Sequence, residues 1–438
     1  MEFLGEQKLI QQAKVGFPKG ITKICDDVYF FLGYGGSTCI LVVGDSSCLL
    51  IDTLNGLGVA TEALAEIKKI SDKPIKNIIY THYTHFDHTG GATVFTDDNP
   101  EIYGHKPVYA QYKHTELIKD ICQIRGARQF GRGLTPQEII SVGVGPINDN
   151  NGKQGHLKCT KLLEDDVTTL NLDGIEVVIV ATAGETDDQI FVYLPKYEVL
   201  CCGDNFYESW PNLYAIRGSQ YRDVSSWVDA LRRMISYNPK YLLPGHTRPI
   251  IGKENVKETL TNYADALEYV LIKTLEGMNQ GKTPDELVEE IKLPEHFAKL
   301  SYLQEYYGTV AWSIRSIFDG YLGWYDGNPT HLGSMKKKDK ALKTIKMMNG
   351  AENIISEINR AITEHEEQWA LELCDILLDA NIEVDTAKKL KATALYILGR
   401  MQTSANGRHY YLSVSKYLSG DMEPAKLSGF GADARKRH

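Results

Sequence analysis

The stretch from Ile79 to Gly91, IYTHYTHFDHTGG, places three histidines and one aspartate within seven residues. An apolar run precedes these polar side chains, and a pair of glycines follows them. Imidazole and carboxylate groups are donors that Zn²⁺ and similar divalent ions accept, and a loop between a strand and a helix can aim several of them at one point. The stretch therefore predicts a metal site at the end of a strand.

Short runs rich in β-forming residues alternate with turn signals on both sides of this stretch, from Ile21 to about Arg248. One segment among them, residues 58–70, has apolar positions at helical spacing. This alternation of strands and helices is typical of an α/β domain. The predicted strands lie within residues 28–33, 37–53, 75–82, 175–182, 189–195 and 199–204.

Several of the predicted strands end abruptly in a residue that can bind a metal ion. Any one such residue is more often a satisfied polar side chain or a helix cap than a ligand. The set is more specific, because two neighbouring metal ions need several donors and a bridging carboxylate. The candidate ligands are His82 or a neighbour of it, His85, Asp87, His88, Glu185, Asp204 and His246, and the segment that ends at Asp52 offers a further carboxylate.

The pattern changes after Arg248 to long amphipathic stretches without β-rich runs. Thr283 can cap a helix that begins at Pro284, and Glu286 completes a capping box with it. We expect two helical groups, at about 255–322 and 338–418, separated by a glycine-rich break.

Composition limits the possible functions. The chain has 438 residues, of which 43% are hydrophobic, enough for two or three globular domains. A net charge of −9 argues against a nucleic-acid partner, and the one basic run, residues 336–340, is short enough to be a solvated linker. The eight cysteines include no CxxC pair and are expected to be buried thiols.

The sequence contains neither the apolar core of a signal peptide nor a segment long enough to span a membrane. We therefore expect a cytoplasmic protein with no membrane partner. A secreted protein whose signal has been removed would have the same sequence.

The motifs together resemble the metallo-β-lactamase superfamily, and within it the alkylsulfatase branch. The resemblance is carried in order by the histidine-rich stretch, by GETDDQIFVYLP with Glu185, by an acidic residue after the next strand, Asp204, by PNLYAIRGSQYRDVSSWVDAL, and by PGHTRPI with His246. It continues through YLGWYDGNPTHL and SANGRHYYLSVSKYL, so that it covers about residues 17–418.

This resemblance implies an αββα sandwich over residues 15–255, an all-α dimerisation domain over 256–420 and a disordered tail over 421–438. It implies two divalent metal ions, with Zn²⁺ the expected ion, and a homodimer. One metal site takes the first two motif positions and Glu185; the other takes Asp87, His88 and His246; Asp204 bridges them. Asn212 and Arg217 correspond to the residues that hold the sulfate group, and a guanidinium suits the oxygens of a tetrahedral anion. With Asp87 they form the expected catalytic set.

Three features depart from the pattern of this branch. Counting back from Asp87 in the H-x-H-x-D-H register puts Tyr83 at the first ligand position, with His82 one residue too early. A phenol is a poor zinc ligand, so we expect a bulge that brings His82 in. Trp312 stands where the branch suggests a histidine near the substrate, and the sterol-carrier-like domain that typically follows is expected to be absent.

The predicted function is therefore hydrolysis of a small alkyl sulfate ester at a dinuclear metal centre. The same scaffold also supports hydrolysis of another anionic ester, such as a phosphodiester, or of a lactone or thioester. A dimeric binding protein with an impaired metal site is the alternative outside the enzymes.

Overall fold

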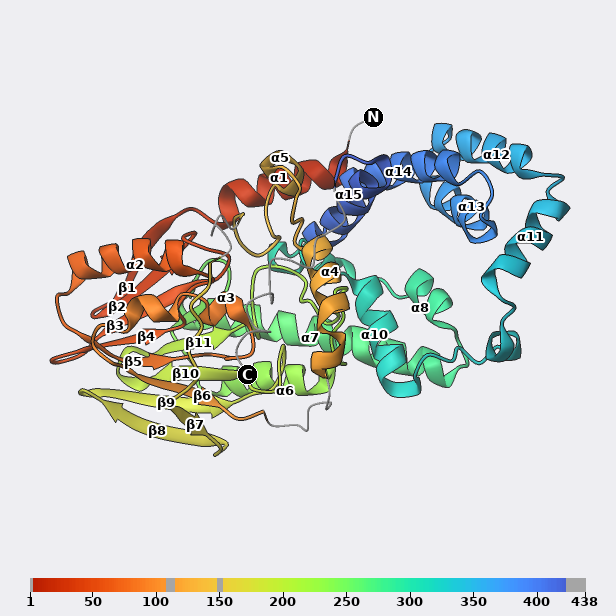
Figure 1. Cartoon of the computed structure of the whole chain (residues 1–438). Coiled ribbons are helices and arrows are strands. Elements are labelled where there is room, and N and C mark those ends of the chain that lie inside the picture. The colour runs from red at the N-terminus through yellow and green to blue at the C-terminus, as the bar shows by residue number, and fades with distance from the viewer. Residues whose placement is uncertain (1–2, 108–114, 148–152, 423–438) are drawn as a thin grey trace.

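The computed structural model describes residues 3–107, 115–147 and 153–422. Two β-sheets face each other in the half of the molecule that contains the N-terminal part of the chain, and helices cover their outer faces (Figure 1). One sheet has the order β1-β2-β3-β4-β5-β6-β7 and the other the order β13-β12-β11-β10-β9-β8. The predicted αββα sandwich is confirmed.

The strands of the first sheet are β1 Gly20–Cys25, β2 Val28–Leu32, β3 Cys39–Val43, β4 Cys48–Ile51, β5 Ile75–Ile79, β6 Glu101–His105 and β7 Lys161–Leu163. Those of the second are β8 Val167–Leu172, β9 Ile175–Ala181, β10 Ile190–Leu194, β11 Val199–Gly203, β12 Tyr241–Pro244 and β13 Ile250–Ile251. The predicted segment 37–53 is a hairpin of two strands, β3 and β4, because Gly44 and the polar residues after it turn the chain.

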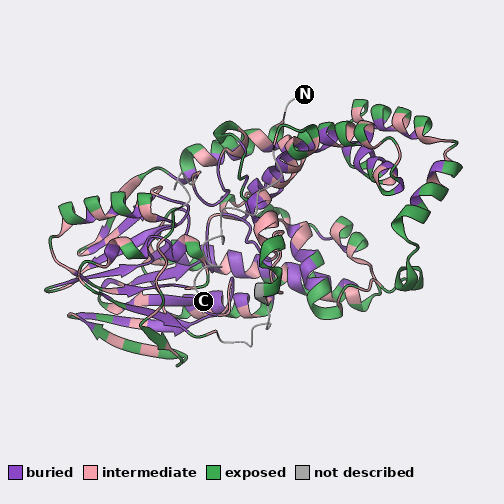
Figure 2. Cartoon of the chain, viewed as in Figure 1, coloured by how far each residue is buried: buried purple, intermediate pink, exposed green. Residues whose placement is uncertain are grey.

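Apolar side chains from both sheets fill the space between them, including Phe30 and Ile51 from one sheet and Val192 and Cys201 from the other. Helix α2 (Leu57–Ile70) and the 3₁₀ turn η1 (Ala92–Phe95) cover the outer face of the first sheet. Helices α6 (Val224–Ser236) and α7 (Lys253–Asn279) cover that of the second. Figure 2 shows the strands as mostly buried and the outer helix faces as exposed. The central strands β3, β4, β10 and β11 are buried along nearly their whole length, because both faces of each sheet are covered.

Helices alone make up the described chain after β13, as predicted. They are α7, α8 Pro284–Glu290, α9 Glu295–Ala298, α10 Val310–Leu322, α11 Lys337–Met347, α12 Ala351–Thr363, α13 Glu367–Ala380, α14 Val384–Met401 and α15 Ala405–Ser419, with 3₁₀ turns η4 Ser301–Leu303 and η5 Pro329–Gly333. The capping box of Thr283 and Glu286 is confirmed at the start of α8. The predicted glycine-rich break lies between α10 and α11.

Three short helices lie in the connections of the sandwich: α3 Phe86–Thr89, α4 Lys119–Gln129 and α5 Pro136–Ile139. The 3₁₀ turns η2 Thr115–Ile118 and η3 Pro195–Tyr197 also lie in these connections. Helices α4 and α5 pack against α15, so residues far apart in the sequence meet beside the sandwich (Figure 1).

Helix α1 (Leu4–Gly16) was not predicted. Its polar composition makes a weak signal for an isolated helix, and it is stabilised by tertiary contacts. Glu6 pairs with Arg400 and Arg408 of the last two helices, and Gln12 donates from Nε2 to the carbonyl oxygen of Gly143 at 2.7 Å. The N-terminal helix is thus docked on the helical half of the chain.

The expectation that all cysteines are buried is partly wrong. All eight are free, but Cys25, Cys122 and Cys159 are half-buried, because they lie on a strand edge, on α4 and in a loop. None of the described helices is both long enough and apolar enough to cross a membrane. The expected tail, residues 421–438, lies outside the described residues except for its first two positions.

Candidate metal centre

The histidine-rich stretch lies where four strands deliver their carboxyl ends to one place. Strand β5 is parallel to β4, and β11 is parallel to β12, so Asp52, His82, Asp204 and His246 follow strands whose ends meet at one edge of the sandwich. Helix α3 follows β5 and carries Asp87 and His88 into the same space.

Two groups of side chains that could hold a metal ion result, and the donor atoms of each group lie within 4.8 Å of one another. The first group contains Asp87, His88, Asp204 and His246; the second contains His82, His85 and Asp204.

Asp204 belongs to both groups through different oxygens. Its Oδ1 lies 3.2 Å from Nε2 of His88 and 3.4 Å from Nε2 of His246, whereas its Oδ2 lies 3.5 Å from Nε2 of His82. A carboxylate oriented in this way can hold two cations at once.

These residues fit a divalent metal ion. Nε2 of His88 and Oδ1 of Asp204 are buried and, although close, have no hydrogen-bond partner among the described residues. Buried polar atoms are normally satisfied, so this pair is typical of a site that binds a cation. Imidazole and carboxylate donors are also the types that zinc-like ions prefer.

Neighbouring groups orient the ligands from behind. Nδ1 of His88 lies 2.8 Å from Oδ2 of Asp52, and Nδ1 of His246 lies 2.6 Å from the carbonyl oxygen of Gly36. Each contact turns Nε2 of the histidine toward Asp204, the usual role of an outer partner in a metal site. Asp52, which the sequence offered as a further carboxylate, thus lies behind the ligands and also accepts hydrogen bonds from Thr81.

The loop after β5 decides which residue faces the cluster. His82 is fully buried, and its Nε2 lies 3.2 Å from Nδ1 of His85. Tyr83 points elsewhere: its ring packs near Gly104, and its backbone N–H donates to Oδ2 of Asp188 at 2.8 Å. Thr84 also donates to Asp188. Asp188, which the sequence reasoning missed, therefore holds the extra residues of the loop away from the cluster.

Glu185 lies beside the cluster but outside both groups of donors. Its Oε1 forms an ion pair of 2.7 Å with Nη1 of Arg222, and its Oε2 accepts a hydrogen bond of 3.4 Å from the hydroxyl of Tyr207. Burial raises the pKa of Glu185, and Arg222 opposes that rise. Arg222 was not singled out from the sequence, although a buried acidic residue needs a partner of opposite charge.

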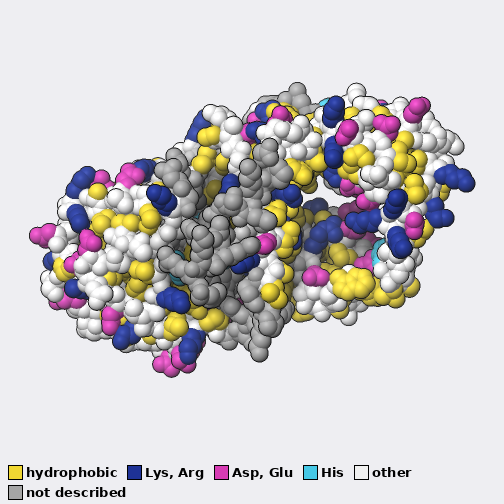
Figure 3. Space-filling model, in the orientation of Figure 1, with side chains coloured by type: hydrophobic (Ala, Val, Ile, Leu, Met, Phe, Trp, Pro, Cys, Tyr) yellow, Lys and Arg dark blue, Asp and Glu magenta, His cyan; other side chains and the backbone are white. Residues whose placement is uncertain are grey.

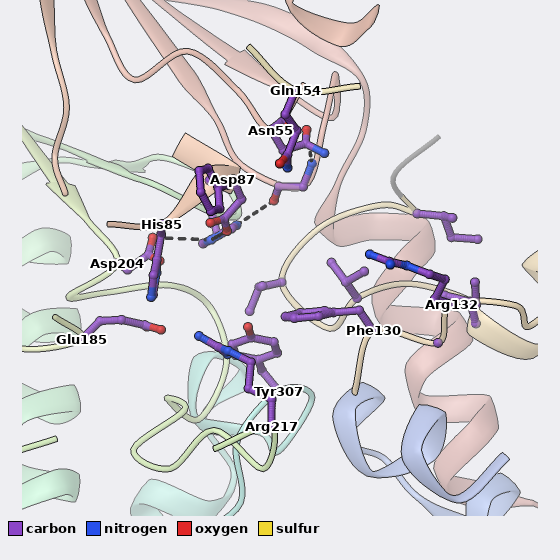
Figure 4. Close-up of a pocket in the computed structure, with 18 of the residues that line it drawn as sticks. Asn55, His85, Asp87, Phe130, Arg132, Gln154, Glu185, Asp204, Arg217 and Tyr307 are labelled. Carbon is purple, nitrogen blue, oxygen red and sulfur yellow. Dashed lines mark hydrogen bonds and ion pairs between the residues drawn. The ribbon is translucent and has the colours of Figure 1, made fainter. Parts of the chain in front are cut away.

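The cluster forms one end of a cavity of about 710 Å³ (Figure 4). Glu185, Arg217 and Tyr307 line the part nearest the cluster. No carboxylate of the described chain pairs with the guanidinium of Arg217, which lies 6.0 Å from the ring centroid of Phe130. The farther wall is mostly apolar and includes Phe130, Leu134, Ile139, Val142, Val144 and Ile147.

Two residues from the sequence analysis are not part of the described cavity wall. Asn212 is fully buried, and its backbone contacts Tyr207 and Arg222. Trp312 packs close to Gly407 of α15. Tyr307 lines the cavity instead, and its backbone oxygen accepts hydrogen bonds from Ser404 and Asn406.

The pKa values of the clustered side chains depend on their burial and on the charges of their neighbours. Burial and the neighbouring His82 hold the pKa of His85 well below its usual range. Burial opposes ionisation of Asp204, but His88 and His246 outweigh it and keep the pKa of Asp204 well below its usual value. Burial opposes protonation of His88 and His246, but Asp204 outweighs it and raises the pKa of both histidines. A cation that binds there must displace their protons, so metal affinity should rise with pH.

Comparisons with known proteins agree with this geometry. The family model described as Metallo-beta-lactamase superfamily matches residues 32–246, and that described as Alkyl sulfatase dimerisation matches residues 283–421. A linear primary-alkylsulfatase from Pseudomonas is 32% identical over 87% of this chain and 74% of its own length. An alkyl/aryl-sulfatase from Saccharomyces cerevisiae is 28% identical over 96% of this chain and 67% of its own length.

A solved structure extends the likeness to the whole fold. That of a stereoselective inverting sec-alkylsulfatase from Pseudomonas superposes with a TM-score of 0.85 at 25% identity, covering 96% of this chain and 68% of the other. The chain spans 63% of the length of an (R)-specific secondary-alkylsulfatase, also from Pseudomonas, that it matches at 28% identity.

Proposed function

Because the chain belongs to the metallo-beta-lactamase superfamily and carries an alkyl sulfatase dimerisation region, we propose that it hydrolyses alkyl sulfate esters at a centre of two divalent metal ions. The observation that carries the proposal is the position of Asp204, whose two oxygens face two separate groups of histidines at the end of a cavity with an apolar wall. Zn²⁺ is the proposed ion, since histidine and aspartate are its usual donors.

We assign the ligands by the two groups of donors. Asp87, His88 and His246 would hold one ion, His82 and His85 the other, and Asp204 both. Glu185 lies next to the second group and is proposed as its remaining ligand, with Arg222 sharing its charge. Bound ions would supply Lewis acidity and lower the pKa of a coordinated water.

The remaining wall of the cavity suits a sulfate ester. The guanidinium of Arg217 can bind two oxygens of the sulfate group and offset charge as it departs. Burial raises the pKa of Tyr307, so its hydroxyl stays protonated and can donate a hydrogen bond to an ester oxygen. Asn212, which does not line the described cavity, is proposed to act from behind the wall, where its backbone oxygen accepts a hydrogen bond from Arg222 and its buried amide has no partner among the described residues. Apolar side chains beyond Arg217 would cover the alkyl chain.

We also propose that residues 15–255 form the catalytic domain and that residues 256–420 form a dimerisation domain. The family match over residues 283–421 and the all-helical character of that region support this division.

One experiment tests the proposed activity. The purified protein is analysed for bound metal and then assayed, with and without a chelator, for release of sulfate from alkyl sulfates, of the alcohol from phosphodiesters and of the hydroxy acid from a lactone. We expect bound zinc, release of sulfate from alkyl sulfates, and loss of that activity in the chelated protein and in Asp204→Ala. Hydrolysis of only phosphodiesters or lactones would show that the substrate is not a sulfate ester. A protein that binds no metal would favour the alternative of a dimeric binding protein.

A further inference from the structure

The cavity has a second cationic group at the end opposite the metal centre. Arg132 lines the cavity on the far side of Phe130, and Figure 4 shows its guanidinium reaching toward the cavity from the side away from Asp204 and His85. Apolar side chains line the wall between the two ends. A ligand that lies along the cavity therefore meets charged groups at both ends and hydrocarbon between them.

The backbone around Arg132 is shaped to present this side chain. Gly131 and Gly133 on either side have φ values of 65° and 91°, which favour glycine. A Cβ on Gly131 would lie 3.2 Å from the ring of His409 and from the side chains of Leu134 and Ile139. No larger residue fits there without a shift, so the turn that carries Arg132 is closely packed from behind.

Helix α15 fixes both ends of this turn. His409 is fully buried, and its two ring nitrogens each lie 3.0 Å from a carbonyl oxygen, one of Gln129 and the other of Ile139. The neighbouring Arg408 donates to the carbonyl oxygen of Glu138 at 2.7 Å. A guanidinium held on such a supported loop loses little freedom when it binds a ligand, which favours recognition.

We propose that Arg132 binds a second anionic group of the substrate, a carboxylate at the far end of the alkyl chain of a sulfate ester. This inference rests on the proposed function of the same cavity. A guanidinium has five N–H donors and matches a carboxylate with two parallel hydrogen bonds, so an anion can bind beside contacts that Arg132 already makes. A plain alkyl tail, in contrast, would place hydrocarbon against the guanidinium, and this contact would contribute no binding free energy.

Binding of uncleavable analogues tests the inference separately from catalysis. Titration calorimetry on the full-length, metal-loaded protein compares alkane sulfonates with ω-carboxyalkane sulfonates over a series of matched chain lengths. The wild type should prefer the carboxylate-bearing ligand by about fivefold, since Arg132 is partly exposed to solvent. The preference should peak at one chain length, because both ends of the cavity are fixed.

Arg132→Met should abolish the preference for the carboxylate-bearing ligand. Arg128→Met, which removes a nearby charge outside the cavity wall, should keep the preference for the carboxylate-bearing ligand. Equal affinity of the wild type for both ligand series, or the same preference in Arg132→Met, would overturn the inference. Absence of sulfate release from any ester, with the binding preference intact, would instead count against the proposed function and not against the second anion site.

Discussion

Oε1 of Glu185 lies 2.7 Å from Nη1 of Arg222, in an ion pair whose two side chains are only 4% and 6% exposed to solvent. This pair is directly beside the metal cluster, and Nη1 of Arg222 also donates to the backbone oxygen of Asn212. Arg222 thus compensates a buried carboxylate that a metal ion would otherwise have to neutralise alone. The charge beside the proposed second metal site is therefore set partly by Arg222, which is not among the proposed ligands.

Removing Arg222 should destabilise the metal-free protein more than the metal-loaded one. Arg222→Met leaves the carboxylate of Glu185 buried without a partner of opposite charge, which costs about 3–5 kcal/mol in comparable sites. Added Zn²⁺ should recover part of this loss. Urea unfolding with and without Zn²⁺ measures both free energies of unfolding. Arg233→Met, which removes an exposed ion pair with Asp166, is the control and should show no dependence on metal. Equal stability of Arg222→Met and the wild type without metal would contradict the prediction.

His82, and not Tyr83, should be needed for the second metal ion. His82 is fully buried against His85, whereas Tyr83 packs on the other side of the loop. Elemental analysis should find about one metal ion fewer per chain in His82→Ala. Tyr83→Phe should keep the metal content of the wild type. Loss of metal in Tyr83→Phe, together with full metal content in His82→Ala, would show that Tyr83 and not His82 occupies the first ligand position.

Arg217 should affect turnover but not metal binding. Its guanidinium lines the cavity, has no carboxylate partner in the described chain and belongs to neither group of metal donors. Arg217→Ala should lower kcat/KM for the best alkyl sulfate by about 10- to 100-fold, the effect of losing a charge-assisted contact in the transition state. Arg217→Lys should recover part of the rate. Unchanged kinetics with an unchanged metal content would remove Arg217 from the sulfate site.

The contact of α1 with the last two helices should depend on pH through Glu6. Hydrogen bonds from Arg400, and the charge of Arg408, lower the pKa of Glu6 from its ordinary value of 4.5. A carboxylate whose pKa is lower in the folded state than in the unfolded state stabilises the fold at pH values above the unfolded-state pKa. This stabilisation is lost as the pH falls through the folded-state pKa.

Wild type and Glu6→Gln should therefore differ by about 1.5–3 kcal/mol in free energy of unfolding at neutral pH, and the difference should shrink well below pH 4.5. Denaturant unfolding over this pH range measures it. Glu62→Gln is the control, because its pair with Lys19 is half exposed and should matter little. A difference that stays constant with pH would refute the role of the Glu6 charge.

The chain from the end of α10 to the end of α11 should lie in a homodimer interface. Tyr321, Leu322 and Trp324 are 48%, 59% and 72% exposed, and Met347 is 83% exposed. Figure 3 shows hydrophobic side chains gathered along the lower edge of the helical half. Light scattering should report a dimer at micromolar concentration, and Trp324→Glu should weaken it by about tenfold or more. Leu162→Glu, at the edge of the sandwich, should not. A monomeric wild type would contradict this prediction.

The features of this protein that could be predicted from its sequence are those that depend on short segments. Strand periodicity, the capping box at Thr283 and the metal-binding residue types are properties of short segments, and the structure has the strands and the box where they were predicted. Helix α1 was missed because its stability comes from partners such as Arg400, nearly four hundred residues away in the chain. Sequence periodicity does not register such contacts.

The sequence by itself predicted an α/β domain followed by helices and offered residue types that can bind a metal ion, since strand periodicity and polar strand ends follow from the order of residue types. Only the tertiary structure decided which donors meet. Asp188 holds the loop so that His82 faces the cluster, and Arg222 pairs with Glu185 from 37 residues away. The physical reason is that a buried charge is stable only beside the partner that the fold brings to it, and that partner comes from a distant segment.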